Sequence, residues 1–233
     1  MLQRSILILI GLSLGSCDKK INYNILEKKI VSKFNDETGN FALAFKNLDD
    51  GKEILINENE IFHAASTIKT PVMIEFYRQL HQGKLSLKDT LQIKNEFKSI
   101  VDGSMYKLSE FDDSDKNTYN KLGQYYSINN LIYEMITISS NFATNILIEY
   151  IGANNVTKSM KEIGALNIDV LRGVEDIKAF ELGLNNTTSA KDLLIIYEKL
   201  AKGKIIDNES SAIMIDILKD QKYDDIIPKY LPK

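Results

Sequence analysis

The chain contains few of the residues from which metal clusters and disulfide frameworks are built. Its 233 residues include one cysteine, two histidines, three prolines and no tryptophan. A single cysteine excludes an intramolecular disulfide framework and a cysteine-based zinc cluster, and two histidines exclude a histidine-rich metal site.

An excess of positive charge is also lacking. There are 29 basic and 32 acidic side chains, which gives a formal net charge of −3 with no basic block. Because nucleic-acid affinity comes largely from neutralising phosphates, this balance argues against a nucleic-acid-binding protein. Hydrophobic residues make up 44% of the chain and charged residues 26%, which is ordinary for a globular protein of one large or two small domains.

The first seventeen residues look like a leader and not like part of the fold. Arg4 precedes an apolar run from Ile6 to Leu14 that is too short to span a bilayer but suits the hydrophobic region of a signal peptide. The sequence from Leu14 to Cys17 resembles the bacterial lipobox, in which cleavage leaves a lipidated cysteine. The alternative is a secretory leader with an incidental cysteine. We expect residues 1–17 to be a lipoprotein-type signal peptide. The protein would then work in the cell envelope, either periplasmic or secreted, and would be attached to the membrane only through its lipid anchor.

Hydrophobic periodicity predicts a mostly helical chain with one early hairpin. A turn at Asp49–Gly51 separates two short alternating segments, which is typical of a β-hairpin. We expect an ordered loop without periodicity over 172–188 and a polar surface loop over 110–115. Helices are predicted over 23–38, from Ser66 to about Gly83, and near 129–138, 142–151, 156–163, 189–202 and 209–219.

Ser66 and Lys69 are the first candidates for chemistry. Positions i and i+3 of a helix share a face, so the serine hydroxyl and the lysine amine can come within hydrogen-bond reach. A lysine in a dry pocket can lose its proton and activate a hydroxyl. The same spacing occurs at Ser16–Lys19 and Ser104–Lys107, but only Ser66 follows a strand pair and opens a strongly apolar helix, whose N-terminus favours a developing anion.

A second candidate is the segment Ser139-Ser140-Asn141, which joins two apolar helical stretches. A hydroxyl and a carboxamide in such a connection could relay a proton and bind a substrate amide. Serine and asparagine also cap helices routinely, so capping is the alternative interpretation.

Together these segments resemble the motifs of one family. The sequence from Phe62 to Pro71 is similar to the nucleophile motif of the class A β-lactamases and penicillin-recognising serine hydrolases, and that from Met135 to Ile148 resembles their second motif and the helix after it. The segment from Leu171 to Ser189 resembles their Ω-loop. The resemblance, which runs from about residue 25 to the end, implies an α/β (α+β) catalytic domain over 23–233: an antiparallel sheet flanked by helices, with an all-helical subdomain.

The resemblance also implies roles for individual residues. Ser66 would be the nucleophile, and Lys69 would assist its deprotonation. Ser139 would pass a proton toward the leaving nitrogen, and Asn141 would bind the side-chain amide of the substrate. The implied partner is a small molecule, either a β-lactam or a peptidoglycan stem peptide, and we expect a monomer without a metal or organic cofactor.

Two glutamates compete for the carboxylate that directs water at the acyl-enzyme in class A enzymes. Glu175 lies three residues after Arg172, which resembles the structural arginine of the loop. Glu181 stands four residues before Asn185, which matches the spacing in the family. We favour Glu175 because the loop length from it to Thr187–Thr188 fits better. The alternative is that both are solvated surface acids.

The sequence departs from the family at two places. Ser140 occupies the central position of a motif that normally reads Ser-Asp-Asn, where the acid is mainly structural. A third motif, Lys-Thr-Gly or Lys-Ser-Gly, is expected after the segment from Ile226 to Pro232 and does not occur. We therefore expect a member truncated before that motif, which lacks the C-terminal strands, one oxyanion donor and a cation for the substrate carboxylate. One lost oxyanion donor costs about 10²–10³ in turnover, and an unpaired sheet edge invites aggregation.

Three functional hypotheses follow. The leading one is a serine β-lactamase that opens the lactam amide through an acyl-enzyme on Ser66 and confers resistance to β-lactams. The second is a D-alanyl-D-alanine peptidase or a related penicillin-binding serine hydrolase, which would use the same serine but lack an effective deacylating glutamate. The third is an inactive, truncated envelope lipoprotein.

Overall fold

A computed structural model describes residues 21–223 and Lys229. Cys17 and the expected signal peptide lie outside the described residues, as does most of the segment from Ile226 to Pro232. The helices and strands, in chain order, are α1 (Tyr23–Asn35), β1 (Leu43–Lys46), β2 (Glu53–Ile56), β3 (Phe62–His63), the 3₁₀-helix η1 (Ala65–Ile68), α2 (Lys69–His81), β4 (Thr90–Gln92), β5 (Phe97–Lys98), β6 (Met105–Tyr106), α3 (Lys116–Tyr119), β7 (Tyr125–Ser127), α4 (Ile128–Thr137), α5 (Asn141–Ile151), α6 (Ala153–Glu162), α7 (Ile177–Glu181), β8 (Thr187–Thr188), α8 (Ala190–Ala201) and α9 (Asn208–Lys219).

The chain divides into two compact units, residues 1–39 and residues 40–233. The described part of the first unit contains α1. This helix begins at Asn22, whose side chain accepts a hydrogen bond from the Ile25 amide at 3.2 Å and so satisfies one of the free N–H groups of the first turn. Within the described residues, we find no helix with the length and apolar character that crossing a membrane requires.

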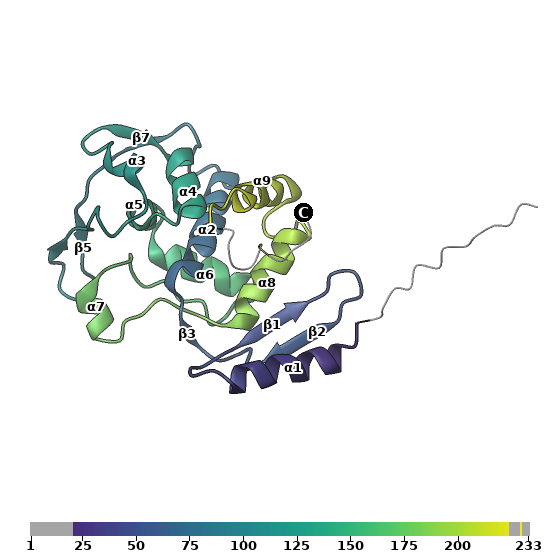
Figure 1. Ribbon diagram of the computed structural model, residues 1–233. Helices are drawn as coiled ribbons and strands as arrows, with labels where there is room; N and C mark the ends of the chain where they lie inside the picture. The colour runs from purple at the N-terminus through teal and green to yellow at the C-terminus, as the bar shows by residue number, and fades with distance from the viewer. Residues whose placement is uncertain (1–20, 224–228, 230–233) are drawn as a thin grey trace, which may run out of the picture. The chain divides into compact units, whose positions relative to one another are not determined.

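The second unit is built around α2. Ten of its 13 residues are buried, among them Val72 and Phe76. A helix that is buried on nearly all sides needs partners all round, and α2 contacts α4, α5, α6 and α9, which are gathered around it in Figure 1. The predicted apolar helix after Ser66 is therefore the centre of the core, and its first two residues, Lys69 and Thr70, are buried.

The described strands form four antiparallel pairs, β1–β2, β3–β8, β4–β7 and β5–β6. The predicted hairpin is β1–β2, with Leu43 opposite Ile56, and α8 packs against β1 (Figure 1). In β3–β8, Phe62 lies opposite Thr188, so the segment leading to Ser66 is tied to the end of the predicted Ω-loop. Small antiparallel sheets combined with many helices confirm the expected α/β (α+β) class.

The prediction of an ordered loop without regular structure over 172–188 is only partly correct. It contains the five-residue helix α7, which begins after Asp176, and ends in the strand β8. A helix of this length shows too few apolar repeats to be recognised by periodicity. The loop is therefore partly regular.

The link between α4 and α5 consists of only three residues, from Ile138 to Ser140. Ser140 is the N-cap of α5 and its hydroxyl accepts a hydrogen bond from the Ala143 amide at 2.9 Å. The alternative interpretation of this segment, helix capping, is therefore correct for Ser140. The residues on either side of it, Ser139 and Asn141, are free to take part in the site.

Candidate active site

The structure places Ser66 and Lys69 together at the start of the central helix. Ser66 lies in the 3₁₀-turn η1 and Lys69 is the first residue of α2. In a 3₁₀-helix the side chains at i and i+3 lie directly above one another. The Lys69 amine donates a hydrogen bond to the Ser66 hydroxyl, with 3.2 Å between Nζ and Oγ.

Ser139 completes a triangle with these two residues. Lys69 Nζ lies 2.8 Å from Ser139 Oγ and 2.5 Å from the Ser139 carbonyl oxygen, and Ser139 Oγ donates to Ser66 Oγ at 3.0 Å. The backbone of Ser139 has a φ of +57°, in the left-handed region that costs energy for any residue other than glycine. This conformation lets its carbonyl and its hydroxyl face the same amine.

The surroundings of Lys69 favour loss of its proton. Its side chain is nearly fully buried, and burial lowers the pKa of Lys69 to about 8, although the charges of Asp113 and Glu175 oppose this shift. Lys69 Nζ also donates to Asn141 Oδ1 at 2.9 Å, so four oxygen atoms surround it. An ammonium has only three N–H bonds, whereas a neutral amine can donate two and accept the proton of a hydroxyl.

Glu175, but not Glu181, joins this cluster. The Asn141 side-chain amide donates to Glu175 Oε1 at 2.9 Å, so Asn141 bridges Lys69 and Glu175. Glu181 lies at the end of α7 and is exposed. The loop therefore brings Glu175, the glutamate that the sequence favoured, into contact with Asn141 and close enough to Lys69 for their charges to interact.

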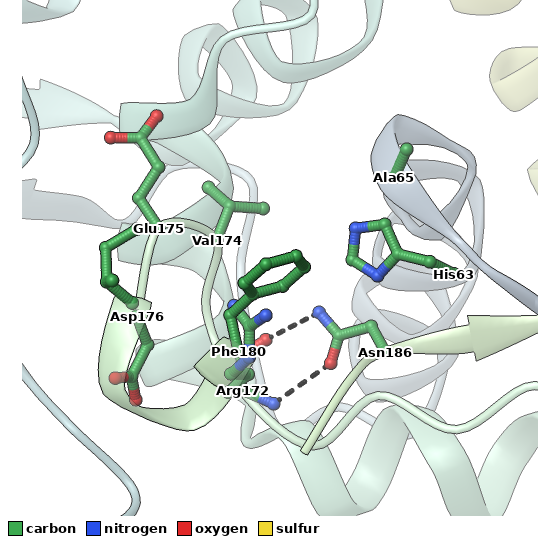
Figure 2. A pocket seen from close by; sticks show the side chains of 9 residues that line it. His63, Ala65, Arg172, Val174, Glu175, Asp176, Phe180 and Asn186 are labelled. Atoms are coloured by element: carbon green, nitrogen blue, oxygen red, sulfur yellow. Dashed lines mark hydrogen bonds between the residues drawn. The ribbon is translucent and has the colours of Figure 1, made fainter. Parts of the chain in front are cut away.

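Arg172 and Asn186 close the base of the loop. The Arg172 guanidinium donates to the carbonyls of Leu184 at 2.9 Å and Gly173 at 3.0 Å and to Asn185 Oδ1 at 3.4 Å. The Asn186 side chain accepts from the Arg172 amide at 3.2 Å and donates to the Arg172 carbonyl at 3.0 Å, as Figure 2 shows. Burial lowers the pKa of Arg172. The arginine thus holds the two ends of the loop together through neutral oxygen acceptors.

Two cavities flank the cluster. One of about 250 Å³ opens beside Ser66 and is also lined by Lys69, Met135, Ser139 and Tyr197 among others. The other, of about 220 Å³, lies between the loop and β3, and in it His63 and Phe180 meet edge to face with ring centres 5.9 Å apart (Figure 2). The first cavity gives a small molecule access to the Ser66 hydroxyl, whereas His63 packs against the loop.

Two residues that support the site escaped the sequence analysis. Asp113 Oδ2 accepts from the Phe142 amide at 2.8 Å and so fixes the start of α5. Asn145 Oδ1 accepts from the Val174 amide at 2.6 Å, and its Nδ2 donates to the Val174 carbonyl at 3.0 Å. Asn145 lies four residues after Asn141, on the same helix face, and that spacing was the available signal. A lone aspartate in a polar loop, such as Asp113, gave none.

Comparisons with known proteins identify a matching family and several similar folds. A model of the β-lactamase enzyme family matches residues 25–233. The chain is 28% identical over 231 residues to β-lactamase BRO-1 of Moraxella catarrhalis, covering 93% of this chain and 68% of that protein. The fold is similar to that of a PBP-A mutant solved as its acyl-enzyme complex with penicillin G, with a TM-score of 0.75, 26% identity and coverage of 90% of this chain and 74% of the other. It is also similar to a β-lactamase from Sphaerobacter thermophilus, with a TM-score of 0.73, 22% identity and coverage of 89% and 73%.

Proposed function

The chain belongs to the β-lactamase enzyme family, and we propose that it hydrolyses β-lactams through an ester formed on Ser66. The observation that carries this proposal is the contact of one buried amine, that of Lys69, with the hydroxyls of Ser66 and Ser139. A nucleophile, its base and a proton donor are thereby assembled beside a cavity.

In the first step the Ser66 oxygen attacks the lactam carbonyl carbon and its proton passes to the neutral Lys69 amine, 3.2 Å away. The carbon–nitrogen bond of the ring then breaks. Ser139 gives its hydroxyl proton to the leaving nitrogen and regains one from Lys69 across 2.8 Å. The product is an ester on Ser66, and Lys69 and Ser139 end the step in the protonation states in which they began it.

In the second step water hydrolyses this ester. The Glu175 carboxylate takes a proton from a water molecule, and the water oxygen attacks the ester carbonyl carbon. The bond to Ser66 Oγ breaks and the proton returns to that oxygen. Asn141 binds the side-chain amide of the substrate, and its contacts with both Lys69 and Glu175 support this role.

Turnover of nitrocefin, combined with intact-protein mass spectrometry, tests the proposal. We expect the chromogenic lactam to be hydrolysed repeatedly, with an adduct on Ser66 that decays as product forms. A stable adduct without turnover would favour the second candidate, a penicillin-binding peptidase. That candidate is supported by the similarity to PBP-A, whose mutant was solved with penicillin G attached. The absence of both adduct and turnover would favour an inactive lipoprotein.

We also propose that the protein is a lipoprotein of the bacterial cell envelope. The support is the sequence alone, which places the single cysteine, Cys17, directly after the apolar run that ends at Leu14. Cells supplied with labelled palmitate should incorporate the label into this protein and keep it in the membrane fraction. A Cys17→Ala variant that keeps the label would contradict the proposal.

A further inference from the structure

Glu175 has a strained backbone. Its φ is +62°, in the left-handed region that glycine prefers. Such a conformation persists only where the surrounding structure imposes it. The position of the Glu175 carboxylate therefore depends on the contacts that fix the residues before and after it in the chain. The preceding residue, Val174, forms hydrogen bonds to the Asn145 side chain through both its backbone N–H and its carbonyl.

The following residue, Asp176, is held from the other side. The residue is only 2% exposed, and its carboxylate oxygens accept three hydrogen bonds: from the Ser99 hydroxyl at 2.8 Å, from the Ile100 amide at 2.9 Å and from the Ala179 amide at 3.3 Å. The first two donors belong to the turn between β5 and β6. The third is in the first turn of α7, whose N-cap is Asp176. One buried carboxylate thus joins the loop to the β5–β6 hairpin.

A second contact between the same segments lies at the surface. Lys178 Nζ is 2.7 Å from Asp102 Oδ2 and 2.7 Å from Ser104 Oγ, in the same turn of the hairpin. The hydrogen bond from Lys178 lowers the pKa of Asp102. Because both charged side chains are about half exposed, this pair contributes little to the free energy of unfolding. Asp176 is the stronger connection.

Figure 2 shows that the side chains of Glu175 and Asp176 point in opposite directions from adjacent positions of the loop. Binding of Asp176 by the hairpin therefore turns Glu175 the other way, where its Oε1 meets Asn141. We propose that Asp176 is a positioning residue, which uses the β5–β6 hairpin to hold the Glu175 carboxylate in place for hydrolysis of the acyl-enzyme. This inference rests on the proposed function in so far as it assigns that step to Glu175.

The acceptor pattern explains why aspartate suits this position. All three partners donate a hydrogen to the carboxylate, and two of them are backbone N–H groups that cannot reverse their role. In Asp176→Asn, the amide nitrogen must face one of these donors, so at least one bond is lost. In Asp176→Ala all three are lost. We therefore expect a graded effect, with the asparagine variant between the wild type and the alanine variant.

The rates of formation and decay of the penicillin adduct separate positioning from general damage. The active fraction is first counted by the amount of protein that becomes acylated. We expect the adduct of Asp176→Ala to decay at least about 10-fold more slowly than that of the wild type, because misplacing a reacting group by an ångström can cost about 10²-fold in rate. The adduct should form at a rate within about threefold of the wild type. An adduct lifetime equal to that of the wild type in the active fraction would overturn the proposal.

Asp192→Asn is the matched control. Asp192 is also buried and its Oδ2 accepts a backbone hydrogen bond from a distant segment, from the Asn167 amide at 2.6 Å, but it lies outside the loop. This variant should lower the melting temperature while its adduct decays at the wild-type rate. A slowed decay in Asp192→Asn as large as that in Asp176→Ala would show that loss of stability explains the effect, and would overturn the positioning role.

A second measurement does not depend on turnover. The side-chain amide of Asn141 gives a pair of NMR signals that report its bond to Glu175 in the free protein. In Asp176→Ala these signals should move toward the positions that they take in Glu175→Ala; unmoved signals would contradict the proposal. If the wild type is never acylated by penicillin, the proposed function fails, but these signals still decide whether Asp176 places Glu175.

Discussion

The Asn141 side-chain amide donates to Glu175 Oε1 at 2.9 Å. The same side chain accepts a hydrogen bond from Lys69 through Oδ1, also at 2.9 Å. One carboxamide therefore contacts both the amine to which we assign ester formation and the carboxylate to which we assign ester hydrolysis. Because an amide offers both an acceptor and a donor, it can satisfy these two groups at once.

Replacing Asn141 by alanine should slow both steps. The Lys69 amine loses an acceptor and the Glu175 carboxylate loses a donor, so neither group stays in place. We expect the rates of adduct formation and of adduct decay each to fall by about 10-fold or more, because misplacing a reacting group by an ångström can cost about 10²-fold in rate. Stopped-flow mixing with nitrocefin, followed at short and long times, measures both rates. A variant slowed in only one step would contradict the bridging role.

Replacing Glu175 by glutamine should stop hydrolysis of the adduct while leaving its formation largely intact. Glutamine keeps an oxygen that can accept from Asn141 but cannot take a proton from water. Glu181→Gln is the matched control, because Glu181 lies in the same loop and is exposed. Mass spectrometry should find the adduct accumulating only in Glu175→Gln. Accumulation in Glu181→Gln, with normal turnover in the other variant, would transfer the role to Glu181.

The rate of acylation should increase with pH. Burial lowers the pKa of Lys69 to about 8, and the neutral amine is the form that can take the proton of Ser66. About a tenth of the protein is in this form at pH 7 and about half at pH 8, so the rate should rise about fivefold between these values and level off above pH 9. The measurement is the single-turnover rate of adduct formation from pH 6 to 9.5. A rate that stays constant over this range would show that the proton of Ser66 goes elsewhere.

Gly173 should not tolerate a side chain. A Cβ atom built at this position would lie 2.6 Å from Asn145 Oδ1, which holds the Val174 amide. In Gly173→Ala either Asn145 or the loop must move, so we expect a loss of about 1–3 kcal/mol in the free energy of unfolding. The adduct should also persist longer, because Val174 precedes Glu175. Urea denaturation and adduct decay test the two effects. Wild-type values in both would show that the loop accommodates the methyl group without displacing Glu175.

Each of the two pairs in this site could be predicted from local signals, and the resemblance to the class A family implied that the pairs act together. Ser66 and Lys69 stand one 3₁₀-turn apart at the start of an apolar helix, and Ser139 and Asn141 flank the capping residue of the next helix. Each pair needs only a short sequence to bring its members together. The choice of Glu175 over Glu181 depended on loop length, which the fold then supported by placing Glu175 beside Asn141.

Two of the supporting residues, Asp113 and Asp176, could not be predicted, because their contacts join segments far apart in the chain. Asp176 bonds to Ser99 and Ile100, which precede it by 77 and 76 residues, and Asp113 bonds to Phe142, 29 residues later. Such pairs leave no spacing that periodicity can detect. The short helix α7 was missed for the opposite reason, since five residues are too few to show a helical period.

Labelling with a fluorescent penicillin tests the central claim, that the Ser66 hydroxyl forms an ester with a β-lactam, most directly. We predict that the purified protein becomes labelled and that Ser66→Ala does not, while Ser104→Ala, which alters the serine of another Ser-x-x-Lys string, is labelled like the wild type. Peptide mapping should find the label on the peptide that contains Ser66. A folded wild-type protein that stays unlabelled, or a Ser66→Ala variant labelled as strongly as the wild type, would contradict the account.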